Sequence, residues 1–383
     1  MECKTNSTLT TSYSQELICQ EPNLKKQKFS TKNNSEKLKK IYAEFDDISK
    51  ECLKSLKEEY IKSFYTKFGT KEKEFLENRF SEFFEHAVYG GKMTRSRLSF
   101  SVFQMLKEDK PSLSIDSNSA LKVILSIELL QAVFLVIDDV MDGAETRRGK
   151  VCWYKMPSIG MAALNHALRL QNFVNISILN SIPNHQNLGE ILKVAWETIQ
   201  VTSDGQELDG FSSKAADCTF ERYSQIVANK TSRYTFYYPI AVAFLLANES
   251  KYLEQILELS EEFGYFFQAQ DDLLDFVDND EITGKTCCDI REGKCTWFSC
   301  KTMEKLANDC EKKKQFEECY GSSDPVKVSK AKKIMEDCNL IQDFNIFQKD
   351  MICKINQKID EFPIENVKTA FQTIFNSLIN RKK

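Results

Sequence analysis

The sequence has few residues that break helices or form tight turns. Its 383 residues include only 13 glycines and 7 prolines, fewer than half of the roughly 46 expected at about 12% average usage. A β-sandwich or β-barrel needs turn residues about every 8–12 positions, so this scarcity excludes a sheet-rich fold. It is instead typical of long helices joined by few loops. Because 42% of the residues are hydrophobic, the chain can fill a sizeable core, which excludes a wholly disordered protein.

Histidine and metal-binding cysteine pairs are also scarce. The chain has 3 histidines, and none of its 13 cysteines stands in a Cys-x-x-Cys pair, which excludes a zinc-finger protein. Scattered cysteines in odd number are typical of free thiols in a reducing compartment. No apolar secretory segment follows Met1, and no arginine precedes Arg79, which disfavours a mitochondrial presequence. We therefore expect a cytoplasmic protein.

Neither positive charge nor long apolar runs are in excess. The 52 Lys and Arg residues against 56 Asp and Glu give a formal net charge of −4, so we expect no nucleic-acid partner. Apolar runs such as 240–247 are far shorter than the ~20 residues that cross a bilayer, and we expect no membrane span. Any anion must therefore be bound by a local cluster of basic residues.

The apolar residues that are present recur with helical spacing. Residues 1–35 contain few large apolar side chains, and we predict a disordered polar tail there. From residue 36 to residue 383, the three- and four-residue spacing predicts one all-α domain of about ten or more helices. The predicted helices cover residues 41–56, 75–84, 121–141, 186–204, 218–247, 251–276, 296–318, 327–337, 342–360 and 364–380. The segment 121–141 is apolar on every side, which is typical of a helix buried in the core.

The first aspartate motif lies at the end of that apolar helix. Asp138 and Asp142 are four residues apart and share a helix face, and Asp139 lies beside them. Three carboxylates in a core helix would repel one another and lose their hydration at a high cost. They become reasonable if they bind a hard cation such as Mg²⁺. The alternative is a solvated helix end that forms salt bridges to Arg147 and Arg148.

A second motif repeats the same spacing. Asp271, Asp272 and Asp275 also follow an apolar helical segment, and two such costly patterns favour a shared function over coincidence. If the two motifs face each other, their carboxylates form a cleft for several Mg²⁺ ions. Mg²⁺ commonly shares its coordination with substrate phosphates, so the predicted ligand is a phosphate or diphosphate.

Basic residues accompany both motifs. Six of them flank the motifs or the predicted helices: Lys92, Arg95, Arg147, Arg148, Lys230 and Lys285. Taken singly, each is an ordinary surface charge. Beside aspartate-bound metals, they suit a second anion or an oxyanion leaving group.

Together these motifs resemble the trans-isoprenyl diphosphate synthase family, and most of all its farnesyl diphosphate synthases. The resemblance runs from about residue 36 to the C-terminus, and both Asp-Asp-x-x-Asp motifs carry it. Shorter motifs follow in the same order: Gly90-Gly91-Lys-x-x-Arg95, Glu128-Leu-Leu-Gln131, Arg147-Arg148-Gly149, Gly205-Gln206-x-x-Asp209, Lys230-Thr231-x-x-Tyr234, Gln268-x-Gln270 and Lys294-Cys-x-Trp297. The resemblance implies the isoprenoid synthase fold, an all-α bundle around a central cavity, and a homodimer.

The resemblance also implies roles for individual residues. About three Mg²⁺ ions, which Mn²⁺ can replace, would be bound by Asp138, Asp139, Asp142, Asp271, Asp272 and Asp275. The allylic diphosphate would contact Arg147, Lys230, Lys285 and a closing C-terminal tail that contains Arg381. The homoallylic substrate, isopentenyl diphosphate, would contact Lys92, Arg95, Gln131 and Arg148. The reacting centre would be lined by Lys230, Thr231, Tyr234 and Gln268.

The reaction that the resemblance implies is a Mg²⁺-dependent condensation of an allylic diphosphate with isopentenyl diphosphate, giving farnesyl diphosphate or a similar short-chain product. Metals and basic residues stabilise the departing diphosphate, and a dry apolar cavity shelters the carbocation. Product length would depend on Val133 and Phe134, one turn before Asp138, where farnesyl-forming members carry two bulky residues. The alternative is that the smaller Val133 belongs to ordinary helix packing.

Several positions depart from the family pattern. They are Thr94 and Ser96 beside Arg95, His166, Ser232 and Arg233, Cys287 and Cys288, and Asn380. These departures open a second hypothesis, a terpene synthase lyase that ionises and cyclises farnesyl diphosphate without isopentenyl diphosphate. The retained residues of the second diphosphate site favour condensation. A third hypothesis, a non-catalytic partner subunit, predicts the loss of an aspartate motif, and this chain keeps both.

Overall fold

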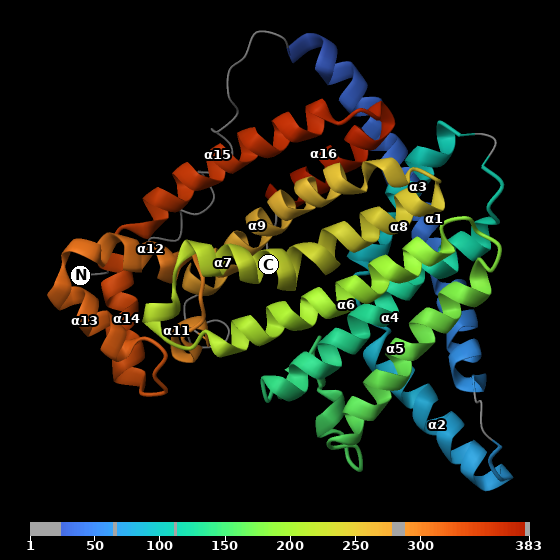
Figure 1. Cartoon of the computed structure of the whole chain (residues 1–383), viewed down its shortest axis with the longest axis horizontal. Helices are drawn as coiled ribbons and strands as arrows, with labels where there is room; N and C mark the ends of the chain where they lie inside the picture. The colour runs from blue at the N-terminus through green and yellow to red at the C-terminus, as the bar shows by residue number, and fades with distance from the viewer. Residues whose placement is uncertain (1–23, 64–66, 111–112, 278–287, 380–383) are drawn as a thin grey trace, which may run out of the picture.

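The computed structural model describes residues 24–63, 67–110, 113–277 and 288–379 (Figure 1). Its α-helices are α1 (Leu24–Lys62), α2 (Thr70–Ala87), α3 (Thr94–Glu108), α4 (Ser117–Met141), α5 (Ala162–Ser181), α6 (Leu188–Phe211), α7 (Phe220–Ile226), α8 (Tyr238–Leu246), α9 (Leu253–Val277), α11 (Cys288–Glu292), α12 (Trp297–Lys305), α13 (Cys310–Cys319), α14 (Pro325–Asp337), α15 (Leu340–Glu361) and α16 (Glu365–Ile379). The strands found in these ranges, β1 (Thr146–Arg147) and β2 (Lys150–Val151), form one antiparallel hairpin. The predicted all-α fold class is confirmed.

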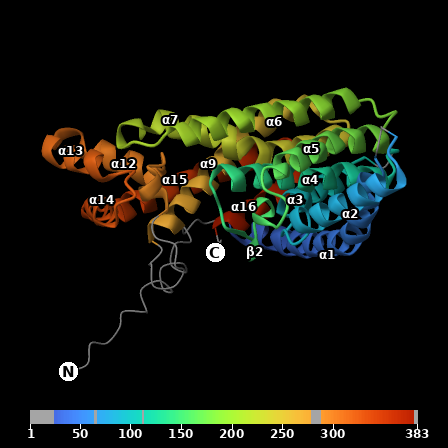
Figure 2. The ribbon, with the colours of Figure 1, turned by 90° about the horizontal axis from the view of Figure 1, so that it is seen from below.

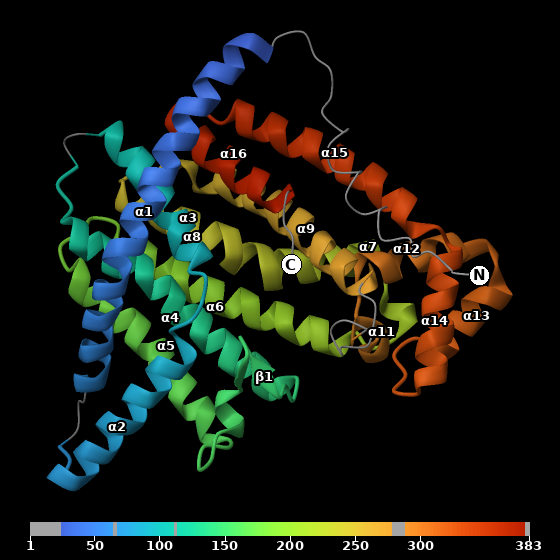
Figure 3. The ribbon, with the colours of Figure 1, turned by 180° about the vertical axis from the view of Figure 1, so that it is seen from behind.

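Helix α4 lies at the centre of the bundle. It packs against α1, α3, α5 and α8, and its side chains from 121 to 133 are almost all buried (Figures 1 and 3). In the view of Figure 2, α6 and α1 form opposite outer layers with α4 between them. This burial explains why the segment is apolar on all sides. Among the described helices, α4 alone is long and apolar enough to cross a bilayer, and 78% of its most apolar window is buried inside the bundle.

A second apolar cluster closes the end of the molecule that lies at the left in Figure 1. Helices α7, α12, α13 and α14 contribute to it, and Trp297, Phe298 and Phe316 are among its buried side chains. Helix α9 joins the two clusters, because Phe263 belongs to the main core and Ala269 to the second. The two clusters therefore meet along the helix that carries the second aspartate motif.

Some helix boundaries differ from the prediction. Helix α1 begins at Leu24, within the segment predicted as a polar tail, and residues 1–23 lie outside the described residues. The predicted helix 296–318 is interrupted by a 3₁₀ turn at Leu306–Asn308. The side chain of Asp309 then accepts the backbone N–H of Lys312 and caps α13, so a new helix starts there.

Helices α3 and α5 were not among the predicted helices. The buried positions of α3 include Ser96, Ser99 and Ser101, and polar residues at buried positions weaken the apolar periodicity. On α5, the apolar residues Leu164 and Leu168 are exposed, so apolar positions do not mark the buried face of this helix. Apolar periodicity therefore misses a helix when its buried positions are polar or its exposed positions are apolar.

The predicted helix 218–247 consists of three segments, because the π-helical segment η3 (Val227–Tyr237) lies between α7 and α8. A β-carbon added to Gly205 of α6 would lie 2.4 Å from the backbone nitrogen of Lys230. Only glycine therefore allows this close approach of α6 and η3. π-Helical turns are rare and occur frequently at functional sites.

Candidate active site

A cavity of about 700 Å³ lies between α4, α5, α6, η3 and α9. Along α4, its lining passes from Val133 and Phe134 to Asp138, and α9 contributes Asp271. Ile199 of α6 adds to the apolar part of the wall. The cavity is therefore apolar along α4 and acidic where the two aspartate motifs begin, which suits a ligand with an apolar tail and an anionic head held through cations.

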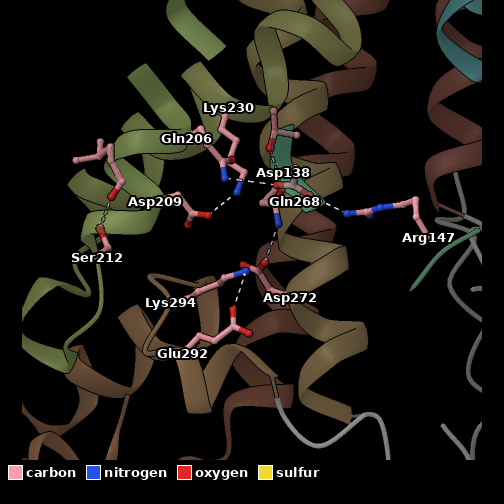
Figure 4. Close-up of polar contacts among 12 residues, drawn as sticks. Asp138, Arg147, Gln206, Asp209, Ser212, Lys230, Gln268, Asp272, Glu292 and Lys294 are labelled. Atoms are coloured by element: carbon pink, nitrogen blue, oxygen red, sulfur yellow. Dashed lines mark hydrogen bonds and ion pairs between the residues drawn. The ribbon is translucent and has the colours of Figure 1, made fainter. Parts of the chain in front are cut away.

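The first aspartate motif is bridged by an arginine (Figure 4). Arg147 Nε donates to Asp139 Oδ1 at 2.7 Å, and its Nη2 donates to Asp138 Oδ2 at 2.8 Å. Asp138 lines the cavity, whereas the buried Asp139 does not. Burial, together with repulsion from Asp138, raises the pKa of Asp142 at the end of α4. The salt bridges that the sequence offered as an alternative to metal binding thus exist for Arg147.

The adjacent aspartates Asp271 and Asp272 of the second motif have different surroundings. Asp271 lines the cavity, but Asp272 is buried and accepts hydrogen bonds from Gln268 Nε2 at 3.1 Å and from the backbone N–H of Trp297 at 2.8 Å. Burial raises the pKa of Asp272 to about 7, although these donors oppose the shift. Asp272, predicted as a metal ligand, therefore lies outside the cavity lining and anchors the N-terminus of α12.

Carboxylates crowd together near the second motif. The backbone N–H of Asp289 donates to Asp275 Oδ2 at 3.4 Å, and burial with repulsion from Asp275 and Asp272 holds the pKa of Asp289 well above its usual value. Burial alone would lower the pKa of Lys294, but the charges of Asp289 and Asp209 raise it. A bound cation would relieve the same crowding that Lys294 relieves in part.

The donor set fits a hard cation such as Mg²⁺. Asp138 and Asp271 present carboxylate oxygens from two helices to one cavity, and Mg²⁺ prefers oxygen ligands. Within the described part of the chain, no three acidic, histidine or cysteine side chains are already arranged so that they alone could hold a metal ion. A cation there would take the rest of its coordination from water and from substrate phosphate, as Mg²⁺ commonly does.

Lys230 lies opposite the first motif on η3 and pairs with Asp209 of α6 (Figure 4). Gln206, one turn earlier on α6, donates to Asp138 Oδ1 at 3.4 Å. Both Lys230 and Gln206 line the cavity. The ammonium group is therefore held at the acidic end by a carboxylate, where it can stabilise a departing anion.

Two of the predicted reacting-centre residues, Thr231 and Gln268, form one connected chain with Asp272. Thr231 Oγ1 donates to Gln268 Oε1 at 2.8 Å, and the amide of Gln268 donates onward to Asp272. Thr231 is buried, and both Thr231 and Gln268 line the cavity. Because the Gln268 amide donates to Asp272, its oxygen faces Thr231, and the hydroxyl group of Thr231 has a fixed orientation.

A second group of basic residues gathers around the loop before α3. A β-carbon added to Gly91 would lie 2.8 Å from Arg148 Nη2, so the guanidinium group of Arg148 rests on the loop that carries the exposed Lys92. Burial lowers the pKa of Arg148, and the charges of Arg147 and Arg95 add to this effect. Mutual repulsion among these cations would be relieved by an anion.

Arg95, Tyr234 and Gln131 form a further polar group at the cavity. Arg95 Nη2 donates to the Tyr234 hydroxyl oxygen at 2.7 Å, and this hydroxyl donates to Gln131 Oε1 at 3.3 Å. All three residues line the cavity. The guanidinium carbon of Arg95 lies 4.2 Å from the centroid of the Tyr234 ring, in the range of a cation–π contact. The structure thus brings together three residues that the resemblance assigns to substrate binding and catalysis.

The apolar wall contains both residues proposed to limit product length. Val133 and Phe134 line the cavity, and the ring of Phe134 packs edge-on against Tyr234 with centroids 5.1 Å apart. This contact fixes the bulky ring beside the reacting centre. Gln171 of α5 also lines the cavity, and it was not predicted from the sequence because α5 itself was not.

Two predicted site residues, Lys285 and Arg381, lie outside the described residues. The structure adds Asp209, Asp289 and Lys294 to the site, which received no role from the sequence. The motifs Gly-Gln-x-x-Asp and Lys-Cys-x-Trp contain two of them. Their charges are the signal that could have identified them, but only the fold shows that they meet.

A helical bundle with these two aspartate-bearing helices beside a central cavity has the isoprenoid synthase fold. The chain matches the Polyprenyl synthetase family model over residues 77–338. It belongs to this family and is a prenyltransferase.

Curated relatives support the assignment over most of the chain. Farnesyl pyrophosphate synthase of Rattus norvegicus is 32% identical over 322 residues, which cover 82% of this chain and 91% of the relative. The enzyme of the same name from Artemisia annua is 32% identical over 338 residues, which cover 86% and 96%. A solved structure of T. brucei farnesyl diphosphate synthase with a bound homorisedronate superposes with a TM-score of 0.77 at 24% identity, covering 90% of this chain and all of that one. This structural likeness shows the shared fold.

Proposed function

We propose that the protein extends an allylic diphosphate with isopentenyl diphosphate in a Mg²⁺-dependent reaction, giving farnesyl diphosphate or a similar short-chain product. The allylic substrate would be dimethylallyl, geranyl or farnesyl diphosphate. The observation that carries the proposal is the presence of two groups of basic residues. One group, Arg147 and Lys230, accompanies the aspartates, and the other, Arg148 with Lys92 and Arg95, lies around the loop before α3. Two diphosphates need two such groups.

In this proposal the aspartates of the two motifs would hold about three Mg²⁺ ions together with the allylic diphosphate, and Asp138 and Asp271, which line the cavity, would be the first of these ligands. The ions, when bound, neutralise the charge that develops on the departing diphosphate. Arg147 and Lys230 add fixed positive charge at the same place. The apolar wall of the cavity keeps water from the allylic cation until the alkene of isopentenyl diphosphate attacks. The released diphosphate then accepts the proton lost from the new chain.

The cyclisation hypothesis rests on the departures from the family pattern, which include Thr94 and Ser96 beside Arg95. Ser96 stands where the family has glycine, but its hydroxyl donates to the carbonyl oxygen of Ile124 at 2.9 Å and its N–H donates to Glu128 at 3.1 Å. The substitution is thus accommodated by hydrogen bonds to α4, and Arg95 still lines the cavity. This supports condensation over cyclisation. The presence of both aspartate motifs likewise disfavours a non-catalytic subunit.

One experiment separates these functions. The purified protein is incubated with Mg²⁺ and farnesyl diphosphate alone, and separately with dimethylallyl and isopentenyl diphosphates, and both volatile and diphosphate products are identified by mass spectrometry. We expect longer prenyl diphosphates that form only when isopentenyl diphosphate is present. A cyclic hydrocarbon or alcohol from farnesyl diphosphate alone would overturn the proposal in favour of a terpene synthase. No turnover in either mixture would favour the partner subunit.

We also propose a homodimer in the cytoplasm. Leu164 and Leu168 of α5, Met161 just before α5, and Trp196 of α6 expose large apolar side chains, and the Trp196 indole donates to Asn175 of α5 at 3.0 Å. An exposed apolar surface on two adjacent helices suits a self-complementary interface with a second copy. The described cysteines are free thiols, which supports a reducing compartment.

A further inference from the structure

Thr235 lies against the guanidinium group of Arg95, in a position outside all the motifs described above. Its hydroxyl oxygen accepts a hydrogen bond from Arg95 Nη2 at 2.9 Å. The same nitrogen donates to the Tyr234 hydroxyl group. Thr235 is 8% exposed, so water cannot readily replace it at this nitrogen. The side chain therefore contributes a buried hydrogen bond to a charged group, which is stronger than a bond between neutral groups.

These contacts restrict the guanidinium group on one edge. The edge at Nη2 is held by the oxygens of Thr235 and Tyr234, and the guanidinium carbon lies 4.2 Å from the centroid of the Tyr234 ring. A guanidinium group is planar and its donors have a fixed geometry, so two fixed oxygens at one nitrogen restrict its orientation. Both protons of Nη2 are used, which leaves Nη1 and the partnerless N–H of Nε for an anionic ligand.

Consecutive residues can reach one nitrogen because they lie on η3. A π-helix has more residues per turn than an α-helix, so the side chains of Tyr234 and Thr235 are separated by a smaller angle around the helix axis. Both can therefore point to the same side, toward α3. The unusual segment that positions Lys230 and Thr231 thus also positions the support of Arg95.

The support acts on a cation that lies near a second one, Arg148. The charge of Arg95 contributes to lowering the pKa of Arg148, although the carboxylate of Glu128 acts in the opposite direction, so the two guanidinium groups repel each other. Without a fixed partner, Arg95 would gain energy by turning away from Arg148 whenever no anion is bound. A neutral hydroxyl group holds it in place without cancelling the charge that an anion requires.

We propose that Thr235 is a positioning residue that holds Arg95 ready for the diphosphate group of the second substrate. The inference rests on the proposed condensation with isopentenyl diphosphate. Because the support acts before this substrate binds, its loss should raise the KM for isopentenyl diphosphate and leave the KM for the allylic diphosphate and kcat nearly unchanged.

The test uses Thr235→Val, which keeps the size of the side chain and removes the hydroxyl group, and Thr235→Ser, which keeps the hydroxyl group. We expect Thr235→Val to raise the KM for isopentenyl diphosphate at least about tenfold, and Thr235→Ser to stay within about twofold of wild type. Thr198→Val is the matched control, because Thr198 is a buried threonine of α6 that does not line the cavity. It should leave both KM values unchanged.

A double variant shows whether Thr235 acts through Arg95. Arg95→Gln should itself raise the KM for isopentenyl diphosphate, and adding Thr235→Val should raise it no further. Additive effects of the two substitutions on the KM for isopentenyl diphosphate would overturn the inference. An unchanged KM for isopentenyl diphosphate in Thr235→Val, or a loss confined to kcat, would overturn it as well. Failure of the wild-type protein to consume isopentenyl diphosphate would instead overturn the proposed function, and the wild-type assay shows this before any variant is measured.

Discussion

Arg147 donates to two carboxylates of the first aspartate motif at once, with Nε bonded to Asp139 and Nη2 bonded to Asp138. Such a bridge requires the fork of a guanidinium group, and a lysine ammonium group is a single point charge that cannot span both carboxylates in the same way. We expect Arg147→Lys to lower kcat by about tenfold to a hundredfold, because Asp138 loses its orientation and the departing diphosphate loses a fixed donor.

Steady-state kinetics with saturating substrates measures this effect. Arg97→Lys is the control, because Arg97 also pairs with an aspartate, Asp46 of α1, but does not line the cavity. It should retain wild-type activity. A normal kcat in Arg147→Lys would show that the bridge to the first motif is not needed for turnover.

Removal of divalent metal should stop diphosphate release. Asp138 and Asp271 face one cavity from two helices, and without a cation the incoming diphosphate would meet their negative charge directly. We expect EDTA to abolish turnover and added Mg²⁺ to restore it, with Mn²⁺ as a weaker substitute. Asp138→Ala should lower kcat by about two or more orders of magnitude, because the loss of one preorganised group that stabilises transition-state charge typically has an effect of this size. Turnover that persists in EDTA would contradict the metal assignment.

The adjacent residues Asp271 and Asp272 should respond differently to the same substitution. Asp271→Asn changes a side chain that lines the cavity, and we expect a large loss of kcat with little change in thermal stability. Asp272 accepts one hydrogen bond from the side-chain amide of Gln268 and one from the backbone N–H of Trp297. Asp272→Asn replaces one of the two accepting oxygens with an amide nitrogen, so one of these N–H donors loses its acceptor. The unmatched buried donor should lower the free energy of unfolding by about 1–3 kcal/mol.

Thermal unfolding and kinetics on both variants check this prediction. If Asp272→Asn unfolds as the wild type does and loses all activity, then Asp272 acts as a ligand and not as an anchor for α12. If Asp271→Asn keeps full activity, the second motif does not serve the reaction.

The sequence predicts the chemistry of the site better than its geometry. Two repeated aspartate motifs on apolar helices predict metal-bound diphosphate, because a hard cation offsets the cost of placing several carboxylates close together. The sequence cannot show which of two neighbouring aspartates faces the cavity, since Asp271 and Asp272 differ only in their angle around α9. That angle depends on the packing of α12, whose N-terminus binds Asp272. Tertiary contacts between distant segments decide it.

The fold was likewise predictable where burial and apolar character coincide. The segment 121–141 matches α4 closely, whereas α5 was missed because it exposes leucines and buries polar residues such as His166. The π-helical segment η3 could not be predicted, and neither could the close approach of Gly205 on α6 to the backbone of Lys230, because the two segments are distant in the sequence. No local propensity encodes that contact.

The exposed apolar face of α5 and α6 should form the subunit interface. Leu168 is 62% exposed, and burying such a side chain against a second copy stabilises a dimer by about 1.5–3 kcal/mol. We expect Leu168→Glu to shift the protein toward monomer in size-exclusion chromatography with light scattering. Val326→Glu is the control, because Val326 is 75% exposed on α14, which lies at the left end of the molecule in Figure 1, whereas α5 lies to the right. It should leave the oligomeric state unchanged, and a wild-type monomer would contradict the proposal.

His166 should make stability fall in mild acid. Its Nδ1 accepts a hydrogen bond from the Trp153 indole at 3.0 Å, which requires this nitrogen to be unprotonated. Burial and the charges of Arg79 on α2 and Arg169 on α5 lower its pKa. Below pH ~6.5 the unfolded chain therefore binds a proton that the folded chain does not, so the free energy of unfolding decreases as pH falls toward the lowered pKa.

Denaturant unfolding at pH 7.5 and at about pH 5.5 measures this loss, and His166→Asn isolates it, because asparagine offers an oxygen acceptor to Trp153 and does not titrate. Burial also lowers the pKa of His86 and of His185, whereas the raised pKa values of Asp142, Asp272 and Asp289 act in the opposite direction. These contributions are common to both proteins, so the change in stability on acidification should be less unfavourable in His166→Asn by the contribution of His166 alone. An equal change in the free energy of unfolding between the two pH values in both proteins would contradict the prediction. It would mean that His166 binds a proton equally in the folded and unfolded states, despite its hydrogen bond from Trp153.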